Sequence, residues 1–226
     1  MEAAAYRHRG EDNAFVGGVG AEHRNRVRPV ADLEATYADF AAARGLESLP
    51  GFAAGPLTPL LVESGDGGIA PAARGRLGGE VDGVVGQLAY TRNKTFRFSV
   101  ALAEVPASTA FVPRLFCIRQ GRQTRDDEFY GFQARESKLW TESIALNERY
   151  TVSTSPYQDP NWLRQLFSPA FVDWLASNAP AGFSFELAYG ALLGSVEGGD
   201  PDRAGLAALC EATAHVAERI AAESGE

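Results

Sequence analysis

The clearest pattern along the chain is an alternation of apolar and polar residues between residues 84 and 102. The apolar positions that share one face are Val84, Leu88, Tyr90, Phe96, Phe98, Val100 and Leu102. A period of two residues is typical of a β-strand with one buried face. Because Thr91 to Lys94 interrupt this alternation, the pattern predicts two strands joined as a β-hairpin.

Shorter apolar runs predict further strands. The most regular one extends from Ser143 to Val152, where Ile144, Leu146, Tyr150 and Val152 share one face. The other predicted strands cover Phe111–Arg119, Phe129–Gln133 and Phe183–Tyr189, with a further candidate at Leu57–Val62. The remainder of residues 50–79 is rich in glycine, proline and alanine and is predicted to form loops.

Three pairs of residues that end in proline predict helix starts. They are Asp159-Pro160, Ser168-Pro169 and Asp200-Pro201. In each pair a side-chain oxygen can accept hydrogen bonds from free backbone N–H groups, and proline at the first helical position loses no hydrogen bond. The last of these helices carries an apolar stripe to about residue 222. A fourth helix is predicted at residues 32–44, where Leu33, Tyr37 and Phe40 recur at helical spacing before Gly45.

Together these elements predict an α+β fold, in which a bent antiparallel sheet packs against helices on one side and is closed by the C-terminal helix. A chain of 226 residues is long enough for one substantial core. Residues 1–30 show no sustained periodicity and are predicted to form a flexible N-terminal segment. Residues 31–226 are therefore predicted to form a single domain that includes the helix at 32–44.

The centre of the chain resembles a bacterial family of domains of unknown function. The matching pieces are Glu142 to Asn147, Tyr150-Thr151-Val152, Leu166-Phe167-Ser168-Pro169 with Phe171 and Leu175, and Phe183 to Gly190. In that family a phenylalanine-asparagine pair and an aromatic-x-valine strand precede a leucine-threonine-proline helix start and a short β-hairpin. Here Leu146 replaces the phenylalanine and Ser168 replaces the threonine. The resemblance implies a fold unit over residues 142–190 and implies no activity.

Composition narrows the class of protein. The formal net charge of −8 argues against a nucleic-acid-binding surface, which needs a clustered basic face. No apolar run is long enough for a transmembrane helix, although many members of the bacterial family carry paired membrane-spanning helices, and the N-terminus lacks a signal-peptide pattern. The sequence therefore predicts a cytoplasmic protein with no nucleic-acid partner and no integral membrane segment.

The histidine and cysteine residues do not form a cluster along the sequence. His8, His23 and His215 are far apart, and Cys117 and Cys210 show no metal-ligand spacing. Cys117 falls in the middle of a predicted strand, where burial would keep its thiol protonated and unreactive. We therefore expect neither a metal site nor a cofactor.

The most distinctive polar residues accompany the strand predicted at 143–152. In an extended strand Asn147 and Arg149 would point away from the apolar face, with Trp140 and Glu142 immediately before the strand. Such a face is either a solvated sheet surface or a surface that binds a peptide strand or a small ligand, with Arg149 as its anchor. The candidate binding residues are thus Trp140, Glu142, Asn147 and Arg149.

Two functional interpretations are compatible with these patterns. The favoured one is a non-enzymatic protein-interaction module, whose sheet edge or polar face binds a protein partner or a second copy of the chain as a homodimer. The alternative is a hydrolase that uses carboxylates from distant strands, for which Glu104, Glu142 and Glu186 are the candidates. Two carboxylates about 5–10 Å apart in a pocket would favour the hydrolase.

Overall fold

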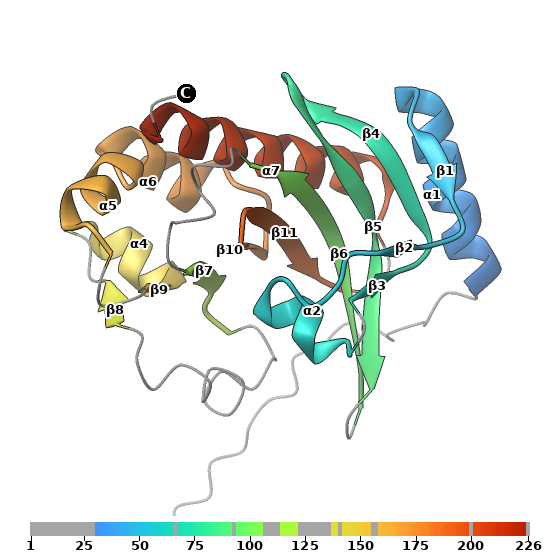
Figure 1. Cartoon of the computed structure of the whole chain (residues 1–226), viewed down its shortest axis with the longest axis horizontal. Helices are drawn as coiled ribbons and strands as arrows, with labels where there is room; N and C mark the ends of the chain where they lie inside the picture. The colour runs from blue at the N-terminus through green and yellow to red at the C-terminus, as the bar shows by residue number, and fades with distance from the viewer. Residues whose placement is uncertain are drawn as a thin grey trace, which may run out of the picture.

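The fold is described from a computed structural model over residues 30–65, 67–91, 94–105, 114–121, 137–139, 142–154, 158–198 and 201–224. The helices in these ranges are α1 Val30–Arg44, α2 Pro59–Glu63, α4 Ile144–Arg149, α5 Pro160–Leu166, α6 Pro169–Ser177 and α7 Arg203–Glu223. The strands are β1 Glu47–Leu49, β2 Phe52–Ala53, β3 Gly68–Ile69, β4 Ala72–Gly78, β5 Val81–Thr91, β6 Thr95–Glu104, β7 Leu115–Arg119, β8 Ser137–Leu139, β9 Tyr150–Thr154, β10 Phe183–Ala188 and β11 Ala191–Glu197. Figure 1 shows their arrangement.

Nine strands form one antiparallel sheet in the order β1-β4-β5-β6-β11-β10-β7-β9-β8, while β2 and β3 pair separately. The register of β5 and β6 runs from Gly83 opposite Ala103 to Thr91 opposite Thr95, which confirms the predicted hairpin. The C-terminal hairpin β10–β11 lies between β6 and β7. The centre of the sheet is therefore complete only when residues 183–197 insert between strands that precede them by many residues.

Helix α7 closes the core on one face of the sheet. The Asp202 carboxylate caps it by accepting a hydrogen bond from the Gly205 N–H at 2.6 Å, so the cap lies two residues after the predicted Asp200. The buried stripe of α7 includes Leu206, Leu209, Cys210, Val216 and Ile220. Figure 1 shows α7 running across the sheet, with α5 and α6 at one end and α1 at the other. The predicted α+β fold with a closing C-terminal helix is confirmed.

A second, smaller core lies on the opposite face of the sheet. It contains the side chains of Leu60 and Leu61 from α2 and alternate residues of β5 and β6, namely Val84, Leu88, Tyr90, Phe96, Phe98 and Val100. The intervening residues Val85, Ala101 and Ala103 belong to the core beneath α7. Since successive residues of a strand point to opposite faces, the centre of the sheet is buried on both sides. Helix α2 is thus the exception to the expected packing of helices on one side.

The prediction of a strand at Ser143–Val152 is wrong for its first half, which forms helix α4. The Ser143 hydroxyl oxygen accepts a hydrogen bond from the Leu146 N–H at 3.2 Å, which caps helix α4. Strand β9 begins only at Tyr150. Ile144 is 74% exposed, so the alternation of residues 144–149 does not mark a buried strand face.

Two interpretations of residues 50–79 are also wrong. The strand candidate at Leu57–Val62 is helix α2, which has Pro59 at its start. A hydrogen bond from the Leu60 N–H to the Glu186 carboxylate attaches this helix to β10. Residues 72–78, predicted to be a loop, form β4, because β1 and β5 pair with its two edges. The short strands β2 and β3, which pair with each other, also lie where loops were predicted. A strand rich in alanine and glycine has little apolar signal of its own, so its neighbours decide its conformation.

Other predictions are confirmed or fall outside the described ranges. Helices α1, α5 and α6 and strand β10 lie where the sequence predicted them, and the predicted third strand is β7, which begins at Leu115. The strand predicted at Phe129–Gln133 and the flexible segment predicted at residues 1–30 lie outside the described residues, apart from Val30. The single domain at 31–226 stays a prediction. No helix within the described ranges is long and apolar enough to cross a membrane.

Candidate functional site

The residues predicted to bind a ligand lie in and around a helix. Asn147 and Arg149 are on α4, the exposed Glu142 comes just before its cap, and Trp140 lies outside the described residues. Residues two apart on a helix point about 200° apart around its axis, so Asn147 and Arg149 do not share the polar strand face that the prediction assumed. The predicted polar strand face therefore does not exist. A binding role for the four residues stays a prediction.

The backbone of α4 has an identifiable structural role. Gln120 donates a hydrogen bond from its side-chain amide to the Asn147 carbonyl oxygen at 2.7 Å, and another from its backbone N–H to the Arg149 carbonyl oxygen at 2.8 Å. The guanidinium of Arg119 lies 5.3 Å from the ring centre of Tyr150. These contacts tie the end of β7 to the junction of α4 and β9.

The three candidate carboxylates occupy different environments. Glu186 is 1% exposed on β10, and its Oε2 accepts a hydrogen bond from the Leu60 N–H of α2 at 2.9 Å. Glu104 is exposed at the end of β6, two strands from β10 in the sheet, and Glu142 is exposed ahead of α4. The structure thus brings the backbone of α2 to Glu186. The alternative hydrolase, which requires two of these carboxylates close together in a pocket, stays a prediction.

The two cysteine thiols are buried and reduced. Burial raises the pKa of the Cys210 thiol to about 12 and raises the pKa of the Cys117 thiol as well, so both stay protonated at neutral pH. Within the described ranges no group of three or more histidine, cysteine or carboxylate side chains could hold a metal ion.

A more distinctive feature is the tip of the β10–β11 hairpin. Ala188 pairs with Ala191, so the turn consists of Tyr189 and Gly190. Their φ angles are 53° and 76°, and two positive values are characteristic of a type I′ turn, whose first position favours asparagine, aspartate or glycine. A left-handed conformation costs an ordinary residue such as tyrosine about 1–2 kcal/mol. Backbone strain of this kind concentrates at functional sites.

The Tyr189 side chain extends into solvent and contacts one arginine. The side chain is 61% exposed, one of the few large apolar side chains in the described part of the chain that are exposed. The Arg114 guanidinium donates a hydrogen bond to the Tyr189 hydroxyl and lies 5.2 Å from the centre of its ring. A cation over a tyrosine ring is attracted to the ring electrons, so the contact restrains both side chains. Strain and exposure are therefore combined at one ordered residue.

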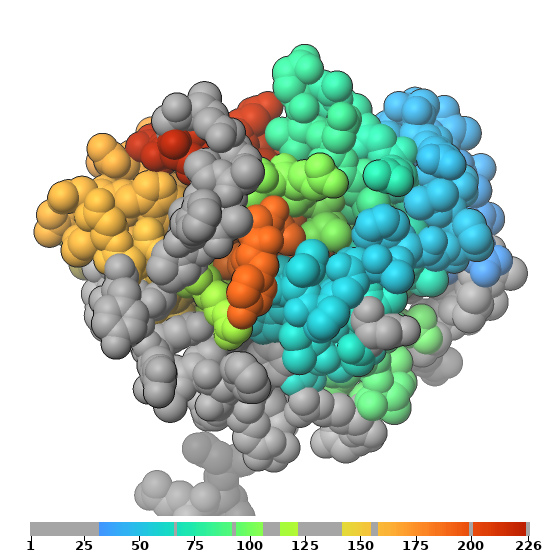
Figure 2. Space-filling view, viewed as in Figure 1, coloured from blue at the N-terminus to red at the C-terminus, as the bar shows by residue number. Residues whose placement is uncertain are grey.

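Neighbouring elements hold this hairpin tip in a rigid setting. Helix α2 is attached to β10 through the buried Glu186 contact, and it carries Val62, another exposed apolar residue. Figure 2 shows the β10–β11 hairpin (orange) at the surface between the cyan segment that includes α2 and the yellow-green start of β7, with the green end of β6 beside it. We call Glu104, Arg114 and Tyr189 the tip surface.

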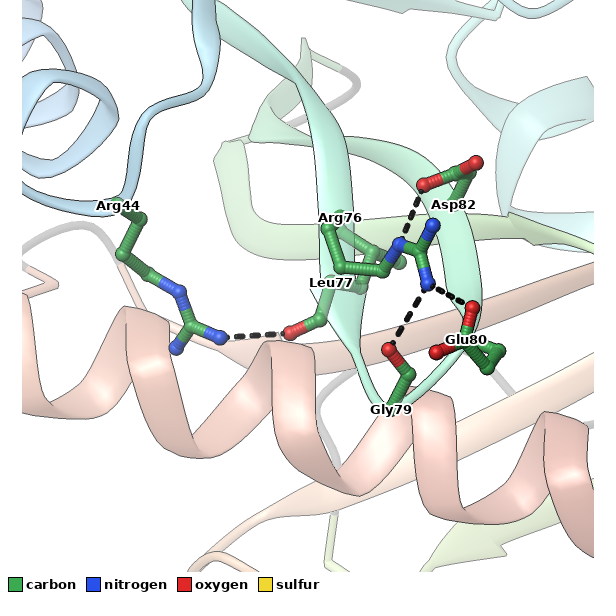
Figure 3. A network of polar contacts seen from close by, with 6 residues as sticks. All are labelled: Arg44, Arg76, Leu77, Gly79, Glu80 and Asp82. Carbon is green, nitrogen blue, oxygen red and sulfur yellow. Dashed lines mark hydrogen bonds and ion pairs between the residues drawn. The ribbon is translucent and has the colours of Figure 1, made fainter.

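The β4–β5 turn lies at the same end of the sheet. Gly83 pairs with Ala103, so Asp82 comes close to the end of β6. Figure 3 shows Arg76 donating hydrogen bonds to Asp82 at 2.9 Å, to Glu80 at 2.6 Å and to the Gly79 carbonyl oxygen at 3.0 Å. Arg76 thus pairs with both carboxylates of the turn. Within the described ranges the nearby Glu104 carboxylate has no hydrogen bond or ion pair.

Nearby, Arg44 fastens α1 to the edge of β4. Its guanidinium donates a hydrogen bond to the Leu77 carbonyl oxygen at 2.8 Å (Figure 3) and pairs with Glu211 of α7 at 3.4 Å. An unpaired carbonyl group at a sheet edge invites pairing with another chain, so this contact blocks that edge. The contact fits a structural role and does not extend the tip surface.

Comparison with known proteins gives a likeness of fold. No protein-family model matches the chain, and no curated protein matches it. A solved structure that does match is the crystal structure of the mycobacterial trehalose monomycolate transport factor A, TtfA, with 11% sequence identity and a TM-score of 0.56. The match covers 84% of this chain and 93% of that chain. At this identity the likeness shows a shared α+β fold alone, and the resemblance of residues 142–190 to a bacterial family stays an expectation.

Sequence reasoning missed the tip surface because it named Glu104 only as a hydrolase candidate and did not connect it with Arg114 or Tyr189. The available signal was Gly190, followed by a second apolar run, since two strands separated by two residues that end in glycine are typical of a tight hairpin. Arg114 carries no such signal, because its contact with Tyr189 spans 75 residues.

Proposed function

We propose that this protein is a non-enzymatic interaction module that binds a protein partner through the tip surface. The observation that carries the proposal is Tyr189, a strained residue that is 61% exposed and ordered by Arg114. Burial of the ring in the folded chain does not offset the cost of its left-handed backbone. Burial against a partner would do so, and this supports a role in recognition.

The chemistry of the surface also supports binding. Tyrosine and arginine are enriched among the residues that contribute most to the free energy of protein association, since each combines a large contact area with hydrogen-bonding groups. Tyr189 lies in the β10–β11 turn and Arg114 comes directly before β7, and the two meet at one end of the sheet. A partner that covers them would contact two elements of a rigid sheet, which limits the entropy lost on binding.

Site-specific photo-crosslinking in the producing cells tests the proposal. A benzoyl-phenylalanine at position 189 should give a discrete cross-linked protein. The same residue at Thr95, an exposed position at the start of β6 and at the opposite end of the sheet, should not. Equal cross-linking at the two positions would contradict the proposal.

The captured protein then allows a quantitative test with Tyr189→Asn. Asparagine tolerates the left-handed backbone, and that gain opposes the loss of the Arg114 contact, so the unfolding free energy should stay within about 1 kcal/mol of the parent. Affinity measured by calorimetry should fall at least about tenfold, as expected for a central interface tyrosine. An unchanged affinity would refute a role for the tip surface. The cytoplasmic location expected from the sequence also remains a proposal, which cell fractionation checks.

A further inference from the structure

The tip surface combines an exposed aromatic ring with an acid. Glu104 pairs with Ala191, the residue directly after the Tyr189-Gly190 turn, so its backbone lies beside the hairpin tip. Both Glu104 and Tyr189 are exposed. Arg114 covers part of the ring, and the remaining exposure leaves ring surface open to a second group.

The charges near this end of the sheet are not balanced. The charged side chains at or near this end are the acids Glu80, Asp82, Glu104, Glu211 and Glu218 and the arginines Arg44, Arg74, Arg76 and Arg114. Arg76 is engaged with Glu80, Asp82 and a backbone carbonyl, and Arg114 is engaged with Tyr189. Two acids near this end, Glu104 and Glu218, have no ion pair within the described ranges, and of these Glu104 pairs with the hairpin through Ala191. The net charge of the chain is −8, so its overall field also favours a cationic partner.

We infer, given the proposed function, that the partner presents a lysine or arginine side chain to the tip surface, stacked on Tyr189 and paired with Glu104. A cation gains both from the negative face of an aromatic ring and from a carboxylate. A partner that presents an acid instead would meet the Glu104 carboxylate, while Arg114, the arginine at the hairpin tip, is already engaged with Tyr189. Charge complementarity thus selects a basic protein segment as the occupant.

Selection from a random peptide library displayed on phage, with the full chain as bait, tests this inference. Peptides that lose binding to Tyr189→Asn should be enriched in lysine or arginine. For a synthetic copy of one such peptide, Glu104→Gln should weaken binding about five- to tenfold, and replacing its basic residue by alanine should do the same. Affinity should also fall as salt is raised, because the carboxylate is exposed. Glu148→Gln, which removes another exposed carboxylate from the distant helix α4, is the matched control and should leave the affinity unchanged.

The outcomes separate this inference from the function on which it rests. Peptides that require Tyr189 for binding, lack basic residues and bind Glu104→Gln with unchanged affinity would overturn the inference of a basic partner. They would leave the proposed interaction module intact. A set of peptides indifferent to Tyr189→Asn would contradict both proposals. A mass measured by light scattering that doubles with concentration, and returns to the monomer in Tyr189→Asn, would replace the basic partner with a second copy of this chain.

Discussion

The packing of α7 on the sheet depends on a missing side chain at Gly194. This glycine lies on β11 opposite Phe185, and α7 approaches it through Thr213. A Cβ atom added at Gly194 would lie 2.0 Å from the Thr213 hydroxyl oxygen, and 3.1 Å from both the Thr213 Cβ and a ring carbon of Phe183. Gly194→Ala must therefore move a buried threonine or displace the helix.

The magnitude follows from these distances. Overpacking a filled core costs about 1–3 kcal/mol, and we expect a value of about 2 kcal/mol because the clash involves a fully buried side chain. Thr213→Ala removes the clashing oxygen together with its hydrogen bond to the Leu209 carbonyl, 2.8 Å away, at a cost of about 1 kcal/mol. In the double variant only the 3.1 Å contacts persist. The combined cost should therefore be at least about 1 kcal/mol less than the sum of the two single costs.

Urea denaturation followed by far-ultraviolet circular dichroism measures all four free energies of the cycle. Gly51→Ala is the matched control, since its added Cβ would meet no atom closer than 3.5 Å, and it should change the unfolding free energy by less than about 0.5 kcal/mol. Additive costs in the double variant would refute the argument, because they would show that Thr213 is not what Gly194 accommodates.

Three further predictions concern buried polar groups. Cys117 and Cys210 should not react with a chromogenic disulfide reagent in the native protein at mildly alkaline pH, and should both react in denaturant, because burial raises the pKa of each thiol; rapid native reaction would show that the core opens. Burial also raises the pKa of Tyr150 from 10.0 to about 12. Folding therefore favours its protonated form, and its contribution to stability is complete below pH 10 and lost as the pH rises toward 12. Tyr150→Phe should flatten that decline in urea titrations across this range, and an unchanged slope would contradict the assignment. Glu186→Leu removes the acceptor of the Leu60 N–H and should cost about 1–3 kcal/mol, with faster limited proteolysis around α2. Glu186→Gln keeps an acceptor and should cost less, so equal losses would count against a hydrogen-bonding role.

Local signals in the sequence were sufficient for several elements. The β5–β6 hairpin was predictable because its alternating residues and its turn are adjacent in the chain. Helix α5 was predictable because the Asp159 carboxylate accepts a hydrogen bond from the Asn161 N–H only two residues away, at 2.8 Å. The cap of α4 was equally local, but the alternation of apolar residues around it resembled a strand. In that case the Ser143 cap was the better predictor.

The candidate site depended on contacts that no local pattern encodes. Glu186 carries no sequence mark of burial, and its environment arises only when α2, which lies 126 residues earlier, packs on β10. The tip surface likewise requires Arg114 and Tyr189 to meet across 75 residues, and Glu104 to pair with Ala191 across the β6–β11 interface.

The sequence alone determined the α+β class, the β5–β6 hairpin, helices α1, α5 and α6, and the apolar stripe of α7. Each depends on side-chain periodicity or capping within a few residues. The tertiary structure decided the strand order, the strand character of β4, the position of α2 on the opposite face and the composition of the tip surface. The physical reason is that strand pairing and burial depend on which distant segments supply hydrogen-bond partners and apolar neighbours, and that choice is made by the core as a whole.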